Sequence, residues 1–251
     1  RYAIAMPTTV GSASLSGITV AAGSTAYSLS AAGPLNLANA GVIANSRKSG
    51  ANPGLTVGVL NLAGSTASVG GIGYTKLSSV TTSSAPATLS LTSGSTQILV
   101  TSADVTTSVG NGATLVVNES SLGDVTVSFG GTLSGPGTYA ASFANNVTLN
   151  GGSTTQAFIG GSGGTNLQSD NFTNNSTVYG GDLTLDFSGV AGGTYFDSWA
   201  TTNIFGGSTS GSFSSVTLAG ANSPYSGLTF TASGGAGRGE WVSGTFAGQG
   251  G

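Results

Sequence analysis

The chain has 251 residues, of which 44 are glycine and only 5% are charged, with eight acidic and five basic side chains that give a formal net charge of −3. It contains no histidine and no cysteine, which excludes Ser-His-Asp triads, Cys-His pairs, thiolate metal sites and disulfides. It has no cluster of lysine or arginine, so binding to a nucleic-acid backbone is not expected.

Small polar residues alternate with Val, Leu, Ile or Phe along the chain, and this pattern predicts half-buried β-strands. Examples of the predicted strands are residues 14–20, 55–64, 87–100, 113–118, 124–129, 146–150, 182–187, 215–220, 227–233 and 240–246. Residues 31–46 are the best candidate for a helix, but they contain two glycines and a proline and are predicted as strand and turn. The sequence has no apolar run of about 18 residues, so no membrane span is predicted.

The turns between these segments favour a β-solenoid over a β-sandwich. They read GG, NGG, GSGG and AGG, which differ from the two-residue signals of regular hairpins. In a solenoid each strand stacks on an equivalent strand about 4.8 Å away. Like residues then lie above like, and stacked like charges repel. We therefore predict an all-β fold in which residues 1–251 form one elongated β-solenoid domain, with a β-sandwich as the alternative.

The C-terminal half carries an ordered series of short motifs. They are GTLSGPGT at 131–138, NVTLNGG at 146–152, FIGG at 158–161, DNFT at 170–173, GGDLTLDF at 180–187 and SGSFSSVTL at 210–218. Their order resembles the end of bacterial autotransporter-type passengers and of related surface proteins. The resemblance implies a right-handed β-helix, although residues 195–205 hold more aromatic side chains than that pattern usually has.

Two aspartates in the stretch GGDLTLDFSG, residues 180–189, are the first candidates for catalysis. In a strand, Asp182 and Asp186 share one face, and four extended residues separate their Cα atoms by about 13 Å. Glycosidase carboxylates lie about 5 to 9.5 Å apart, so we predict a solvated strand face, no catalytic residue and no cofactor. A calcium site that combines them with Asp170, Asp197 or backbone carbonyls stays open as an alternative.

Other polar positions allow a functional and a structural interpretation. Glu240 and Trp241, beside Arg238, could bind a sugar or could end a surface strand with the indole packed inward. The only basic pair, in RKSG at residues 47–50, is predicted to lie in a solvated loop. Acceptor sequences for N-glycosylation begin at Asn118, Asn146, Asn171, Asn174 and Asn175, and they matter only if the source organism glycosylates exported proteins.

The scarcity of lysine and glutamate is typical of secreted proteins, and we expect an extracellular or cell-surface location. The open ends of a solenoid expose unpaired backbone groups, and the apolar segment with Tyr2, Ile4 and Met6 could pair with another subunit as a strand-exchange segment at residues 1–12. We therefore predict a non-enzymatic structural protein that pairs with copies of itself into a surface fibre, matrix filament or layer.

Two other functions remain as alternatives. One is an adhesin module that binds cell-surface glycans through Tyr195, Trp199, Tyr225 and Trp241. The other is a polysaccharide-active β-helix enzyme, which five basic residues disfavour.

Overall fold

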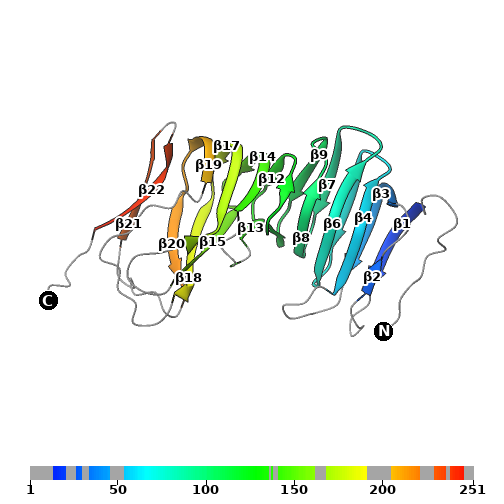
Figure 1. The fold of residues 1–251 in the computed structure, drawn as a ribbon, viewed down its shortest axis with the longest axis horizontal. Helices are drawn as coiled ribbons and strands as arrows, with labels where there is room; N and C mark the ends of the chain where they lie inside the picture. The colour runs from blue at the N-terminus through cyan, green and yellow to red at the C-terminus, as the bar shows by residue number, and fades with distance from the viewer. Residues whose placement is uncertain are drawn as a thin grey trace.

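The computed structural model describes residues 14–20, 27–29, 34–45, 54–135, 137, 141–161, 168–190, 205–220, 229–235 and 238–245. Nearly all of the strands in these residues belong to one sheet, which coils into an elongated solenoid (Figure 1). None of the described residues forms a helix that could cross a membrane.

The strands in chain order are β1 (Ser14–Val20), β2 (Tyr27–Leu29), β3 (Leu35–Asn45), β4 (Leu55–Leu62), β5 (Thr66–Gly70), β6 (Tyr74–Thr82), β7 (Ala87–Leu91), β8 (Gly94–Thr101), β9 (Val105–Val109), β10 (Ala113–Val116), β11 (Ser121–Leu122), β12 (Val125–Val127), β13 (Thr132–Ser134), β14 (Ala141–Leu149), β15 (Thr154–Gly161), β16 (Gln168–Ser169), β17 (Asn171–Tyr179), β18 (Asp182–Val190), β19 (Phe205–Gly211), β20 (Ser215–Ala219), β21 (Thr229–Gly235) and β22 (Arg238–Thr245).

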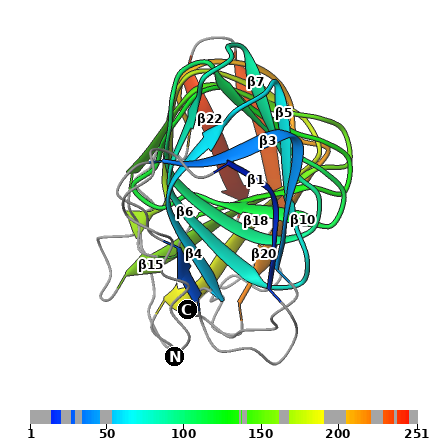
Figure 2. The same cartoon turned by 90° about the vertical axis from the view of Figure 1, so that its right-hand side faces the viewer.

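Parallel pairing stacks these strands into three ladders, and each coil contributes to each ladder in turn (Figure 2). The first ladder holds β2, the starts of β4, β6 and β8, and then β10, β13, β15, β18 and β20. The second holds the starts of β1 and β3, the ends of β4, β6 and β8, then β11 and the starts of β14, β17 and β19. The third holds the ends of β1 and β3, then β5, β7, β9 and β12, and the ends of β14, β17 and β19.

This parallel stacking confirms the predicted β-solenoid, which is a parallel β-helix. Sandwich sheets are antiparallel, so the β-sandwich alternative is wrong. Among the described strands, antiparallel pairs join only β15 to β16 and β21 to β22.

Alternation within each strand fills the interior with apolar side chains. Buried and half-buried residues alternate along β7 and β9, as a period of two requires. The third ladder stacks one such residue per coil into a column, formed by Ile43, Val69, Leu91, Val109, Val127 and Leu149, all at most 2% exposed. Burying each of these side chains stabilises the fold by about 1.5–3 kcal/mol relative to exposure. The predicted stacking of like on like is therefore present in the core.

The coils are shortest in the middle of the solenoid and lengthen from there toward the C-terminus. Leu91 stacks on Val109, which lies 18 positions later in the chain, whereas Asp182 stacks on Ser215, which lies 33 positions later. Aromatic rings replace aliphatic side chains in the longer coils. Phe172 and Phe205 stack with ring centroids 5.1 Å apart, and Tyr179 and Phe213 lie 5.0 Å apart. These four residues form an aromatic cluster in the interior of the C-terminal coils.

Glycines in the left-handed conformation form the corner between the third ladder and the first. Gly94, Gly112, Gly130 and Gly152 have φ angles of 68°, 75°, 71° and 75°. The N–H of each of the first three donates to the carbonyl of the next, at 3.1, 2.9 and 2.9 Å. The NGG signals of the sequence are thus the sharp turns of the coil, where side chains other than glycine are strained.

A matched pair of alanine substitutions tests this corner. Gly112 has open space where a Cβ would lie, so Gly112→Ala should cost only the left-handed backbone penalty of about 1–2 kcal/mol. Gly181 has a φ of 66°, and a Cβ there would overlap the carbonyl oxygen of Ser153, so Gly181→Ala should cost clearly more. Denaturant unfolding followed by circular dichroism measures both. Equal losses of unfolding free energy in the two variants would contradict the steric overlap expected at Gly181.

Candidate functional site

The two aspartates of β18 lie on its outward face, as the alternation predicted. Leu183, Leu185 and Phe187 point inward and are at most 3% exposed, while Asp182 and Asp186 are half-buried. The Oδ1 of Asp182 accepts a hydrogen bond from the Ser215 hydroxyl at 2.7 Å.

Asp186 is held by different neighbours. Its Oδ2 accepts from the Gln156 side-chain amide at 3.1 Å, and its Oδ1 accepts from the Ser188 N–H at 2.9 Å. Each carboxylate on β18 therefore bonds to neighbouring strands or to its own backbone, and this arrangement supports the sheet rather than aligning two acids on one bond.

Asp170 lies elsewhere, in the interior. It comes just before β17, is 1% exposed, and its Oδ2 accepts hydrogen bonds from the N–H groups of Phe158 at 3.0 Å and Gly137 at 3.4 Å. A Cβ on Gly135 would overlap this carboxylate, so the chain packs tightly around it. From the sequence, Asp170 is only a candidate calcium ligand. Its role in anchoring the turn between β16 and β17 was not predicted.

A calcium site gains no support from the described residues, which contain no group of three or more His, Cys, Asp or Glu able to hold a metal ion. Asp197, the other proposed ligand, lies outside the described residues. The calcium site therefore stays a prediction.

The glycosylation candidates differ in how their side chains are engaged. Asn174 is 4% exposed, its Nδ2 donates to Thr177 Oγ1 at 3.0 Å, and its Oδ1 accepts from the Ala144 N–H at 3.2 Å. This amide therefore joins β14 to β17 in the interior. Asn175, in contrast, is exposed on β17.

The remaining acceptor candidates lie at the surface or partly buried. Asn146 is exposed, its Nδ2 donates to Asp124 Oδ1 at 2.9 Å, and its Oδ1 accepts from Ser176 Oγ at 2.7 Å. Asn171 accepts a hydrogen bond from Thr173 Oγ1 at 2.9 Å. Asn118 is half-buried, and its N–H donates to Ser120 Oγ at 2.9 Å.

Several predicted positions fall outside the described residues. These are Tyr2, Ile4, Met6, the strand-exchange segment 1–12, the basic pair at 47–48, and the aromatic residues Tyr195, Trp199 and Tyr225. Arg238, Glu240 and Trp241 belong to β22, and the structure describes their backbone only.

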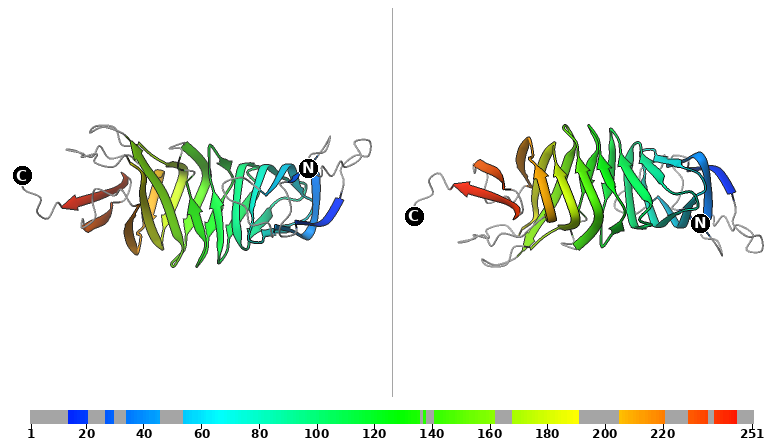
Figure 3. Two further views of the ribbon diagram at one scale, coloured as in Figure 1. Left: turned by 90° about the horizontal axis from the view of Figure 1, so that it is seen from below. Right: turned by 90° about the horizontal axis from the view of Figure 1, so that it is seen from above.

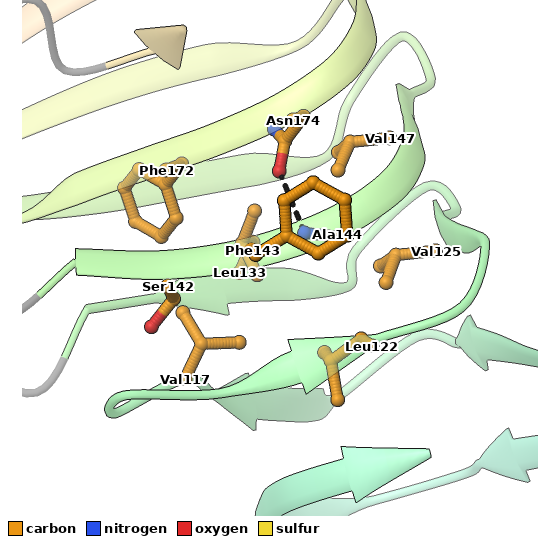
Figure 4. A pocket seen from close by; sticks show the side chains of 10 residues that line it. All are labelled: Val117, Leu122, Val125, Leu133, Ser142, Phe143, Ala144, Val147, Phe172 and Asn174. Carbon is orange, nitrogen blue, oxygen red and sulfur yellow. Dashed lines mark hydrogen bonds between the residues drawn. The ribbon is translucent and has the colours of Figure 1, made fainter. Parts of the chain in front are cut away.

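A small cavity lies inside the solenoid between β11 and β17 (Figure 4). Its volume is about 10 Å³, and its walls include Leu122, Leu133 and Phe172. A space of this size holds about one water molecule. It is therefore a packing gap and not a site for substrate.

The two ends of the described solenoid have a capacity to bind further strands. Within the described residues, β1 pairs only with β3 and β2 only with β4, while β19 pairs only with β17 and β20 only with β18. In the described part of the chain, the outer edges of these four strands have no strand partner, and none of the four contains a charged residue or a proline. Natural proteins commonly use charge or proline to keep such edges from pairing.

The hairpin formed by β21 and β22 lies beyond the last coil at the C-terminal end (Figure 3). It makes its own two-stranded sheet, and no described pairing joins it to the solenoid. It therefore lies beside the C-terminal edges without supplying the strand partner that they lack.

No family model, curated protein or solved structure matches this chain. The resemblance of residues 131–218 to autotransporter-type passengers therefore stays a prediction.

Two alanine substitutions compare the buried and the surface aspartates. Asp170→Ala removes the acceptor of two backbone N–H groups and leaves them buried, which should destabilise the protein by about 1–3 kcal/mol. Asp182→Ala removes one surface acceptor and should change the free energy of unfolding by about 0.5 kcal/mol or less. Thermal and denaturant unfolding of both variants measures this difference, and a larger loss for Asp182→Ala would contradict these roles.

Proposed function

We propose that this protein is a non-enzymatic structural protein of the cell exterior that assembles end to end into fibres by strand pairing between copies. The observation that carries the proposal is the match between the strands at the two ends of the solenoid. The outer strands at the N-terminal end are β1 and β2, and those at the C-terminal end are β19 and β20.

The longer strands of each end correspond in length and place. Both β1 and β19 have seven residues. Both run from the second ladder into the third, and both have a register irregularity at that crossing, between Leu15 and Gly17 for β1 and opposite Thr173 and Ser176 for β19. A second copy placed beyond β19 could therefore continue both ladders with its own β1.

The shorter strands complete the match, because β2 begins the first ladder and β20 ends it. The contact joins different surfaces of the two copies, so it does not close on itself and generates an open filament. The hairpin of β21 and β22 lies on the path of the incoming copy, and assembly requires it to move aside.

Low charge supports the same proposal. The four edge strands carry no charged side chain, so pairing between copies brings no like charges together in a ladder. The unpaired N–H and C=O groups of each edge gain partners when the next copy adds its strands.

The adhesin alternative stays a prediction. Three of its four aromatic residues lie outside the described residues, and the fourth, Trp241, lies in a strand described by its backbone only. The described part of the chain therefore gives it no specific support.

Lysine substitutions at the C-terminal edge test end-to-end assembly. Ser210→Lys with Thr217→Lys adds charge to exposed positions of β19 and β20, and should abolish filaments because charged edge strands resist pairing. Ser108→Lys with Thr132→Lys places the same charge on β9 and β13 in the middle of the solenoid, and should leave filaments intact.

Negative-stain electron microscopy and sedimentation velocity measure filament length for the wild-type protein and both variants. A wild-type protein that stays monomeric at high concentration contradicts the proposal. Equal loss of filaments in both variants would show that general charge, not the edges, controls assembly.

A further inference from the structure

Large and small side chains alternate in one row on the outward face of the second ladder. Stacked pairs join Val59 to Ser79, Ser79 to Val100, Val100 to Ser121, Ser121 to Phe143 and Phe143 to Thr173. We call these six residues the outer row. It runs parallel to the solenoid axis, with one residue per coil.

The large members of this row are unusually exposed for apolar residues. Val59 is 42%, Val100 46% and Phe143 37% exposed, and they account for three of the seven large hydrophobic residues that are exposed in the described chain. The small members between them are two serines and a threonine. The row therefore presents an apolar ridge and a shallow gap in alternation, with a repeat of two strand spacings, about 9.6 Å.

On β3, β4 and β6, the next outward position carries polar side chains that bond to one another. There, the Asn61 side-chain amide donates to Asn36 Oδ1 at 2.7 Å, and the Thr81 hydroxyl donates to Asn61 Oδ1 at 3.3 Å. These polar groups already bond to one another, which lowers the cost of removing water from them. The outer row itself carries no charge.

We propose that the outer row binds the outer row of a second copy of this chain, with the two solenoid axes antiparallel. A two-fold axis at the middle of the row places Val100 opposite Ser121 of the second copy. The same axis places Phe143 opposite the second copy's Ser79, and Val59 opposite its Thr173. Every large side chain then faces a small one, so the six positions interdigitate without a clash.

The pattern favours a second copy over another partner because the row is complementary to itself about this two-fold axis. Such a contact is isologous and closes as a pair. The row spans five strand spacings, about 24 Å, so an isolated pair is weak. In fibres of the kind proposed above, the contact repeats along the axis, and repetition strengthens it. The pairing of outer rows does not itself require end-to-end assembly.

Cysteine cross-linking tests the antiparallel register directly, because the chain has no cysteine of its own. In the proposed pair, Val59 of one copy faces Thr173 of the other, whereas the two positions lie about 24 Å apart within one chain. Val59→Cys with Thr173→Cys should therefore form disulfide-linked dimers when the full-length protein is treated with an oxidant. Neither single variant should do so under the same conditions.

Dimers from the single Val59→Cys variant would overturn the proposal in favour of parallel packing. No dimers from the double variant, with its circular dichroism unchanged, would overturn lateral pairing altogether.

A charge substitution with a matched control gives a second test. Val100→Lys places a charge in the outer row, and Val42→Lys places one on the third ladder, where Val42 is also 46% exposed. Val100→Lys should reduce the association constant for lateral pairs at least tenfold in sedimentation equilibrium, while Val42→Lys should not. Equal effects would contradict the proposal.

The two proposals fail separately. In the Val100→Lys variant, loss of lateral pairs together with normal filament length would support both the end-to-end proposal and the outer-row proposal. Filaments that never form, with Val59–Thr173 dimers still present, would remove only the end-to-end proposal. Filaments without any lateral cross-link would remove only the outer-row contact.

Discussion

Parallel stacking at one strand spacing governs almost every other feature of this protein. Because each residue lies directly above its counterpart in the previous coil, side chains must tolerate a copy of their own kind about 4.8 Å away. Aliphatic columns such as Ile43, Val69 and Leu91 satisfy that condition in the interior. Hydrogen-bonded chains such as Asn36, Asn61 and Thr81 satisfy it on the surface. Stacked like charges would repel, and the aspartates of β18 instead bond to uncharged polar side chains such as Ser215 and Gln156.

The same constraint leaves two kinds of surface unsatisfied. At the ends, β1 and β19 have backbone groups without a strand neighbour in the described sheet. Along the side, Val59, Val100 and Phe143 have apolar area without cover. We propose that the first surface pairs with the opposite end of another copy, and that the second pairs with the same surface of another copy. Together they would lead from single molecules to filaments and from filaments to pairs, without a catalytic group or a cofactor.

The sequence predicted many of the strands, and the stacking of like residues in the core, because both depend on local patterns. The segment predicted as one strand, 87–100, is two strands, β7 and β8, on different ladders. Alternation marked β18, and the NGG stretch marked the corner at Gly152. The sequence could not predict which residues stack on one another in successive coils. The number of chain positions between stacked residues changes from 18 at Leu91 to 33 at Asp182, so there is no fixed sequence repeat that would reveal the stacking. The outer row and the anchoring role of Asp170 depend on that stacking. The buried position of Asn174 and the exposed position of Asn175 follow the alternation along β17 that begins at Phe172.

The lengths of the strands have a mechanical consequence. Backbone hydrogen bonds of a β-helix run along its axis, so a pull on the two ends loads every coil in series. Strands β11, β12 and β13 contain two, three and three residues, whereas β14, β17 and β18 contain nine each. The coils of β11, β12 and β13 therefore have fewer ladder positions in strands than the coils of β14, β17 and β18. Under tension along the axis, we expect the coils to separate more readily at residues 121–134 than at these longer strands.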